Sequence, residues 1–145
     1  MFQNILVLCL GNICRSPVAH VLLQEKTKAT GIQLTIDSAG LTALVGNTPH
    51  PFSLKLLELH KIPITIHLAK QVTLDMTRQA DLILVMDNQQ RRILESKFSG
   101  ISGKIFRLGH FGHFDIPDPY GQGIEAFEKM YDLIDQATDE WMKHL

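Results

Sequence analysis

The sequence predicts a single α/β domain over residues 1–145, with a four-stranded parallel sheet flanked by helices in three layers. Segments with the apolar pattern of strands alternate along the chain with segments of helical period, which is typical of a parallel sheet with helical crossovers. Two of these strand segments, residues 5–8 and 82–85, are continuous apolar runs of the kind that both faces of a sheet cover. A chain of 145 residues can bury one core and has no room for a second domain.

Cap and turn residues place the individual elements. The first strand ends at Cys9, and Ser16 before Pro17 predicts a helix start, with Ser16 as the N-cap and Pro17 as the first helical residue. Thr73 is a cap for a short helix, and Asp87 with Gln90 three residues later resembles a capping box. The expected strands cover residues 5–9, 33–38, 81–86 and 104–108, with a tightly packed turn at 37–40. The expected helices cover residues 17–29, 51–60, 73–79, 88–97 and 127–141.

Composition narrows the class of partner. The formal net charge is −1 and no long basic run occurs, so we expect no nucleic-acid partner and a small molecule or a protein side chain as ligand. No apolar run approaches the length that crosses a bilayer, and the chain does not start with a basic leader, so we expect no membrane insertion. The two cysteines, Cys9 and Cys14, are too close in sequence for a disulfide framework, which favours a reducing, cytoplasmic location.

The loop after the first strand predicts an anion-binding site. Cys9 and Arg15 are separated by five residues that must turn the chain between strand and helix: Leu10, Gly11, Asn12, Ile13 and Cys14. Gly11 and Asn12 tolerate positive φ, so several backbone N–H groups of this loop can point inward. Such a loop at a helix N-terminus binds an anion, most naturally a phosphate.

The cysteine at the edge of this loop is a candidate nucleophile. A helix dipole, converging N–H donors and a nearby guanidinium all favour the thiolate form of Cys9. Arg15 offers a planar fork that can hold two phosphate oxygens. The residues therefore predict attack of cysteine sulfur on phosphorus, with arginine bracing the phosphate.

Two segments together resemble a known family. Residues 9–17, with the sequence CLGNICRSP, and Asp118-Pro119-Tyr120-Gly121 are similar to motifs of the low-molecular-weight protein tyrosine phosphatases of bacterial type. Residues 37–40 and Met86-Asp87 also resemble family segments, so the similarity extends along the whole chain. The resemblance implies a four-stranded parallel sheet flanked by helices, and hydrolysis of phosphotyrosine through a phosphocysteine intermediate that needs no cofactor.

The resemblance also implies roles for single residues. Cys9 would be the nucleophile and Arg15 the phosphate clamp, while Asp118 would protonate the leaving phenolate and then act as base for the attacking water. The hydroxyl of Ser16 would support the thiolate. Two residues, Asn12 and Ser38, would hold the phosphate-binding loop in shape.

The substrate crevice follows from the same resemblance. Ile13, Leu44 and Tyr120 match positions that line it in the family. Where the family often has arginine, this chain has Lys70, which argues against a bidentate role there. The related protein arginine phosphatases usually have threonine where Ile13 stands, and an apolar residue suits an aromatic ring better than a guanidinium.

Several residues have alternative interpretations. Asp115 competes with Asp118 for the acid role. Cys14 either packs beneath the loop or forms a reversible disulfide with Cys9 under peroxide, which would protect the nucleophile from overoxidation. His110 and His113 lack an evident third ligand in the sequence, so we expect no metal site.

Other functions are less well supported by the residues. An arsenate reductase with its own cysteine cascade needs further cysteines, and the chain has none beyond Cys14. A phosphate-binding module without turnover would require neither Cys9 nor Asp118. By analogy with bacterial family members, the expected partner is a phosphotyrosine protein, with a tyrosine autokinase of polysaccharide export as a candidate. The sequence leaves the oligomeric state open.

Overall fold

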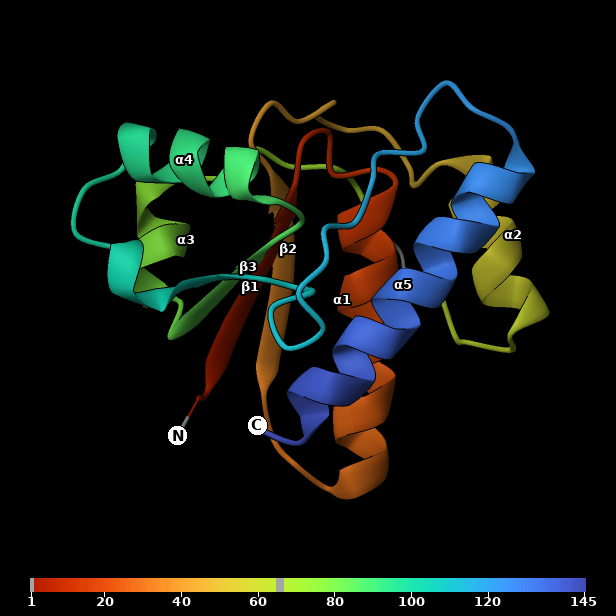
Figure 1. Cartoon of the computed structure of the whole chain (residues 1–145), viewed down its shortest axis with the longest axis horizontal. Coiled ribbons are helices and arrows are strands. Elements are labelled where there is room, and N and C mark those ends of the chain that lie inside the picture. The colour runs from red at the N-terminus through yellow and green to blue at the C-terminus, as the bar shows by residue number, and fades with distance from the viewer. Residues whose placement is uncertain (1, 65–66) are drawn as a thin grey trace.

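The structure is a computed structural model and describes residues 2–64 and 67–145. Its centre is a parallel sheet with the strand order β2-β1-β3-β4 (Figure 1). The strands are β1 (Asn4–Cys9), β2 (Thr35–Gly40), β3 (Leu82–Val85) and β4 (Ile105–Arg107). Both central strands, β1 and β3, are apolar and buried, as the continuous apolar runs predicted.

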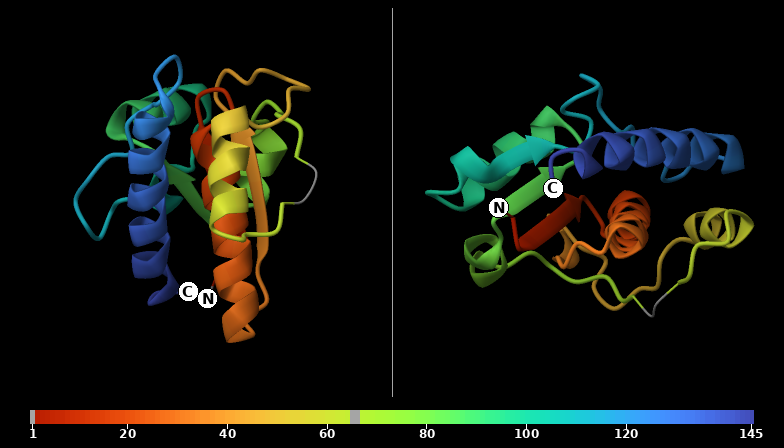
Figure 2. Two further views of the ribbon diagram at one scale, coloured as in Figure 1. Left: turned by 90° about the vertical axis from the view of Figure 1, so that its right-hand side faces the viewer. Right: turned by 90° about the horizontal axis from the view of Figure 1, so that it is seen from below.

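Helices cover both faces of the sheet. The helices are α1 (Arg15–Thr30), α2 (Pro51–Leu59), α3 (Leu74–Gln79), α4 (Asn88–Lys97) and α5 (Ile124–Met142), with a short 3₁₀ turn over Ser102–Lys104. One layer contains α1, α2 and α5, and the other contains α3 and α4 (Figure 1). Figure 2 shows α1 and α5 running alongside each other on their face of the sheet. The three-layer fold expected from the sequence is therefore confirmed.

The hydrophobic core consists of two parts, one on each face of the sheet. The larger part packs α1 and α5 against β1 and β3, with Leu22 and Phe127 among its fully buried side chains. The smaller part lies under α3 and α4 and includes Leu94. Trp141 belongs to the larger core, and its indole N–H donates to the Leu108 carbonyl at 2.8 Å. The aromatic stripe of the last helix is thus a packing surface, as its spacing predicted.

The second strand extends further than expected. Residues 37–40, predicted as a turn, continue the strand because parallel pairing with β1 persists to its last residue, where Cys9 lies opposite Gly40. The close packing expected there is real: a Cβ on Gly40 would lie 2.7 Å from the Leu10 carbonyl oxygen. Gly40 therefore allows β2 to lie directly against the loop that follows Cys9.

The expected N-cap of the first helix is wrong. The helix begins at Arg15, Cys14 occupies the N-cap position, and no side chain caps it. Ser16 lies inside the helix, fully buried, and its hydroxyl contacts Cys9 and Asn12 instead. The Ser16 hydroxyl thus makes hydrogen bonds with buried residues of the loop. The backbone N–H groups in the first turn of the helix have no side-chain cap. The other cap predictions hold, since Thr73 caps α3 and Asp87 caps α4.

Candidate active site

The loop between β1 and α1 holds the candidate nucleophile at the carboxyl end of the sheet. Cys9 is the last residue of β1 and is 2 % exposed. Asn12, three residues later, has φ of 60°, the left-handed conformation that Asn tolerates better than most residues. The chain thus reverses within a few residues, and α1 starts at Arg15.

Buried side chains hold this loop in shape. The Asn12 side-chain amide donates to the Ser16 hydroxyl at 2.7 Å and to the Ser38 hydroxyl at 3.2 Å. Ser16 in turn lies 2.9 Å from the Cys9 sulfur. The predicted supporting residues Asn12, Ser16 and Ser38 therefore meet behind the nucleophile, and all three are inaccessible to solvent.

Arg15 is fixed by three groups from distant parts of the chain. Its Nη1 donates to the Ile116 carbonyl at 2.9 Å and lies 3.9 Å from Asp87. Its Nη2 lies 3.7 Å from the Asp118 carboxylate. The Nε is buried and has no hydrogen-bond partner among the described residues. The guanidinium is therefore held in one place while part of its donor capacity remains available for a ligand.

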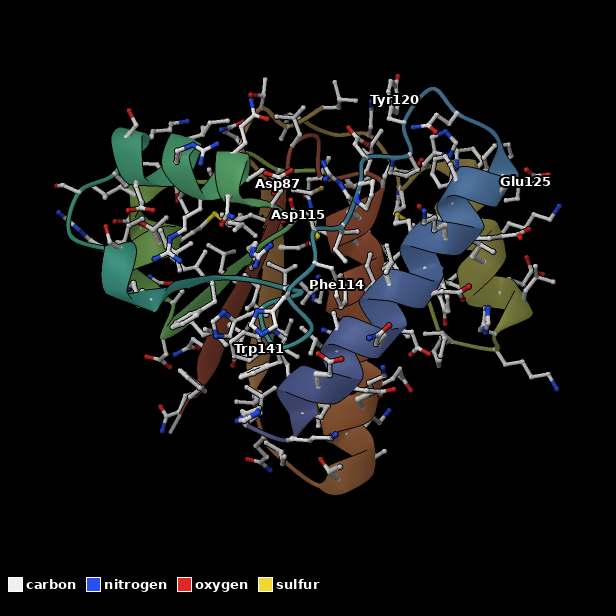
Figure 3. The ribbon with its side chains drawn as sticks, in the orientation of Figure 1. Asp87, Phe114, Asp115, Tyr120, Glu125 and Trp141 are labelled. Atoms are coloured by element: carbon white, nitrogen blue, oxygen red, sulfur yellow. The ribbon has the colours of Figure 1, made fainter. Side chains whose placement is uncertain are left out.

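The two candidate acids differ in their surroundings. Asp115 accepts a hydrogen bond from Arg107 at 2.8 Å, on the side of the loop near β4. Asp118 lines the pocket that contains Cys9, and its Oδ1 accepts the Tyr120 backbone N–H at 3.1 Å. Figure 3 shows Asp115 near Asp87, below the outer tip of the loop that carries Tyr120. The geometry favours Asp118 as the acid.

A pocket of about 330 Å³ brings together most of the predicted site residues, while Asn12, Ser16 and Ser38 lie outside its lining. Its walls are mostly apolar, and its base carries sulfur and the guanidinium. The lining residues are Cys9, Leu10, Gly11, Ile13, Cys14, Arg15, Thr42, Leu44, Asp118 and Tyr120. A larger hollow of about 910 Å³ lies at the other end of the sheet, near Asn4, Thr35 and Leu145, and contains none of the predicted site residues. Apolar walls with a few convergent polar groups are typical of a small-ligand site.

Comparison with known proteins decides the family. The family model described as low molecular weight phosphotyrosine protein phosphatase matches residues 4–145. The chain belongs to this family. It is 40 % identical over 144 residues to the low molecular weight protein-tyrosine-phosphatase Ptp of Acinetobacter johnsonii, with 99 % of each chain covered.

Solved structures of similar proteins superpose closely on the chain. One is Wzb of Vibrio vulnificus in complex with benzylphosphonate, with a TM-score of 0.93, 35 % identity and complete coverage of both chains. Another is the YwlE arginine phosphatase, with a TM-score of 0.93 and 28 % identity, covering 99 % of this chain and 95 % of that one. The family fold thus serves proteins described as phosphatases of different amino acids, so the fold alone does not fix the substrate.

Cys14, within the family loop, has an environment that keeps its thiol protonated. Burial and, to a smaller extent, the nearby negative charges of Cys9 and Asp118 raise the pKa of Cys14 to about 12, against the opposing effect of Arg15. Its backbone carbonyl accepts the Ser53 hydroxyl at 3.1 Å, which ties the loop to α2. Both cysteines are free thiols here and line the same pocket.

Sequence reasoning missed two histidines that support the loop of this phosphatase-family protein. His67 donates from Nε2 to the Asn12 carbonyl at 3.2 Å, and His20 contacts the Ser38 hydroxyl through Nδ1 at 3.1 Å. Burial lowers the pKa of both rings, so both are neutral near pH 7. Nothing in the local sequence of either histidine indicates this role, because both partners lie far along the chain.

Lys70 supports the loop through its backbone. Its backbone N–H donates to Asn12 Oδ1 at 3.0 Å, and its ammonium group pairs with Asp37 at 2.7 Å. The Lys70 side chain is therefore engaged in an ion pair with Asp37, which lies on β2.

Among residues 2–64 and 67–145, no three His, Cys, Asp or Glu side chains gather in a way that could hold a metal ion. Over the same ranges, every helix is too short or too polar to span a bilayer.

Proposed function

We propose that this protein hydrolyses phosphotyrosine in two steps, through a phosphocysteine on Cys9. The observation that carries the proposal is the convergence of Cys9, Arg15 and Asp118 on one pocket, although Asp118 lies more than a hundred residues from the other two in sequence. Membership in a family of phosphotyrosine phosphatases supports the same conclusion.

In the first step, the Cys9 thiolate attacks phosphorus. An S–P bond forms as the bond between phosphorus and the tyrosine oxygen breaks. Arg15 and the loop N–H groups hold the phosphate oxygens and stabilise the charge that develops on them. Asp118 gives its proton to the departing phenolate oxygen, so that tyrosine leaves as a neutral phenol.

In the second step, water hydrolyses the phosphocysteine. Asp118, now a carboxylate, takes a proton from the water molecule whose oxygen attacks phosphorus. The S–P bond breaks, which releases phosphate and restores the Cys9 thiolate. The Ser16 hydroxyl, 2.9 Å from the sulfur, stabilises the returning negative charge. No cofactor takes part in these two reaction steps.

The pocket walls support an aromatic substrate. Ile13, Leu44 and Tyr120 line the space above Cys9 and offer apolar surface to the flat faces of a phenyl ring. Phosphoarginine is the second candidate, favoured by the structural likeness to YwlE. A guanidinium would have to lose water against these apolar side chains, with few hydrogen-bond acceptors, among them Thr42 and Asp118, on the side chains around it, which weakens that alternative.

One assay with matched substrates tests both claims. Wild type should release phosphate from p-nitrophenyl phosphate and from a phosphotyrosine peptide in the presence of chelator, and Cys9→Ser should be inactive. Lack of turnover by wild type would refute the enzyme proposal. The same peptide with phosphoarginine or phosphoserine in place of phosphotyrosine is the specificity control, and equal kcat/KM on all three would refute the tyrosine preference.

The proposed protein substrate is a tyrosine autokinase of the kind that controls polysaccharide export in bacteria. The proposal rests on the family analogy, and relatives from bacteria with the same phosphatase description support it. Phosphorylated autokinase from the same genome should lose its phosphotyrosine when mixed with wild type, and Cys9→Ser should co-purify with the phosphorylated form only. A kinase that keeps its phosphotyrosine under these conditions excludes this substrate.

A further inference from the structure

A chain of hydrogen bonds runs from the nucleophile to the first helix. Starting at the Cys9 sulfur, it passes through the Ser16 hydroxyl, the Asn12 amide and the Ser38 hydroxyl, and ends at Nδ1 of His20. The successive separations are 2.9, 2.7, 3.2 and 3.1 Å. His20 lies four residues after Ser16 on α1, so one helix carries two members of the chain, whereas Cys9 lies at the end of β1.

The direction of the two Asn12 protons in this chain follows from one backbone group. The Lys70 backbone N–H can only donate, so the atom of Asn12 that it contacts must be the carbonyl oxygen. The other end of the Asn12 side chain is then the NH₂ group, which donates one proton to Ser16 and one to Ser38. Each serine oxygen is thereby an acceptor toward Asn12 and has its own proton to give elsewhere.

In one arrangement that these contacts allow, the two serine protons point in opposite directions. Ser16 can give its proton to the Cys9 thiolate, and Ser38 can give its proton to His20 Nδ1. This arrangement requires a neutral imidazole with its proton on Nε2. The pKa of His20 is lowered to about 4, chiefly by burial and to a smaller extent by His67 and Lys70. The Asp37 charge and the Ile36 backbone act in the opposite direction.

The two ring nitrogens of His20 differ in their hydrogen-bond partners. Nε2 is buried and has no hydrogen-bond partner within the described ranges. The polar contact left to the ring within these ranges is therefore the one between Nδ1 and the Ser38 hydroxyl, at 3.1 Å. The His67 ring lies edge-on, with its centroid 6.3 Å away, and does not supply the missing partner.

We infer that His20 is a positioning residue for the proposed phosphatase reaction: its Nδ1 accepts the Ser38 proton and so keeps the Asn12 amide and the Ser16 hydroxyl directed toward the Cys9 sulfur. Without an acceptor at this place, the Ser38 hydroxyl would turn and Asn12 would lose one of its two fixed acceptors. Ser16 would then be held less firmly against the thiolate. The inference rests on the proposed function, because His20 is assigned a positioning role for the same nucleophile, Cys9.

Two substitutions of His20 separate hydrogen bonding from packing. His20→Leu keeps much of the volume and removes the acceptor, whereas His20→Asn keeps an acceptor close to the position of Nδ1 and loses volume. We expect His20→Leu to lower kcat on p-nitrophenyl phosphate about three- to tenfold, the value of one hydrogen bond, with KM changed less than twofold. His20→Asn should retain kcat within about twofold of wild type, on the same reasoning.

A second readout follows the sulfur without any phosphatase turnover. The rate at which iodoacetamide alkylates Cys9 depends on its thiolate fraction, so the pH profile of alkylation should move to higher pH in His20→Leu and stay near wild type in His20→Asn. Alkylation in Cys14→Ser backgrounds confines the signal to Cys9. His113→Asn, the same change at an exposed loop position with positive φ, is the matched control and should behave as wild type.

The outcomes distinguish the inference from the proposed function. If wild type turns over substrate but His20→Asn is as impaired as His20→Leu, or more so, the ring acts by packing and the inference is wrong. It is also wrong if His20→Leu keeps both wild-type kcat and the wild-type alkylation profile. A wild type without activity would refute the proposed function, while the alkylation profiles would still test the hydrogen-bond chain. Melting temperatures of all variants show whether each protein is folded in the assay.

Discussion

Asn12 offers a sensitive test of how the loop is held, because it combines a strained backbone conformation with three buried hydrogen bonds. Its φ is 60°, and its side chain contacts Ser16, Ser38 and the Lys70 backbone N–H. Two substitutions divide these contributions. Asn12→Gly removes the side chain but accepts the left-handed conformation, whereas Asn12→Ala removes the same hydrogen bonds and also opposes that conformation.

The expected magnitudes follow from these contacts. Three hydrogen bonds at about 1 kcal/mol each give a loss of about 3 kcal/mol in the free energy of unfolding for Asn12→Gly. Asn12→Ala should lose about 1 kcal/mol more, because a Cβ disfavours the left-handed region. Activity should fall in both variants, since Ser16 loses the donor that fixes its hydroxyl.

Urea denaturation measured by fluorescence of Trp141 gives both free energies in one experiment, and kcat on p-nitrophenyl phosphate gives the catalytic effect. The reasoning fails if Asn12→Ala is as stable as Asn12→Gly, because the left-handed conformation would then carry no strain. It also fails if both variants lose less than about 1 kcal/mol, since three buried hydrogen bonds cannot be worth so little together.

Three further predictions concern the acid, the cysteines and pH. Asp118→Asn should slow turnover most for substrates with poor leaving groups, while Asp115→Asn should leave kcat nearly unchanged; the opposite pattern would transfer the acid role to Asp115. Mild peroxide should give a reversible Cys9–Cys14 disulfide detectable by mass spectrometry, and finding Cys9 only as sulfinic acid would exclude it. The pKa of His20 is about 4 in the folded protein against 6.5 for a free ring, so unfolding takes up a proton between these values and stability should fall as pH drops from about 6.5 to 4. The loss attributable to this ring is about 3 kcal/mol at most, and urea titrations of His20→Leu should show a correspondingly flatter profile. An unchanged slope would assign the acid sensitivity to other groups.

Local sequence was enough to predict most of the secondary structure. Pro51 as the first residue of α2, Thr73 before α3 and Asp87 before α4 act within a few residues of their own positions, so their effects can be predicted from the local sequence. The errors occurred where distant partners compete. Ser16 gave up its expected N-cap role for buried partners, and residues 37–40 extended β2 because β1 offers pairing up to Cys9.

The sequence alone predicted Cys9 as nucleophile, Arg15 as phosphate clamp and an anion-binding loop between them, because a cysteine, five residues and an arginine between a strand and a helix fit few other arrangements. The family resemblance already favoured Asp118 over Asp115, but only the tertiary structure shows Asp118 at the pocket, since its position there depends on how the long loop packs around Arg15. The same holds for His20 and His67, whose partners lie on other elements. Short-range patterns encode the reactive loop, whereas long-range packing decides which polar groups surround it.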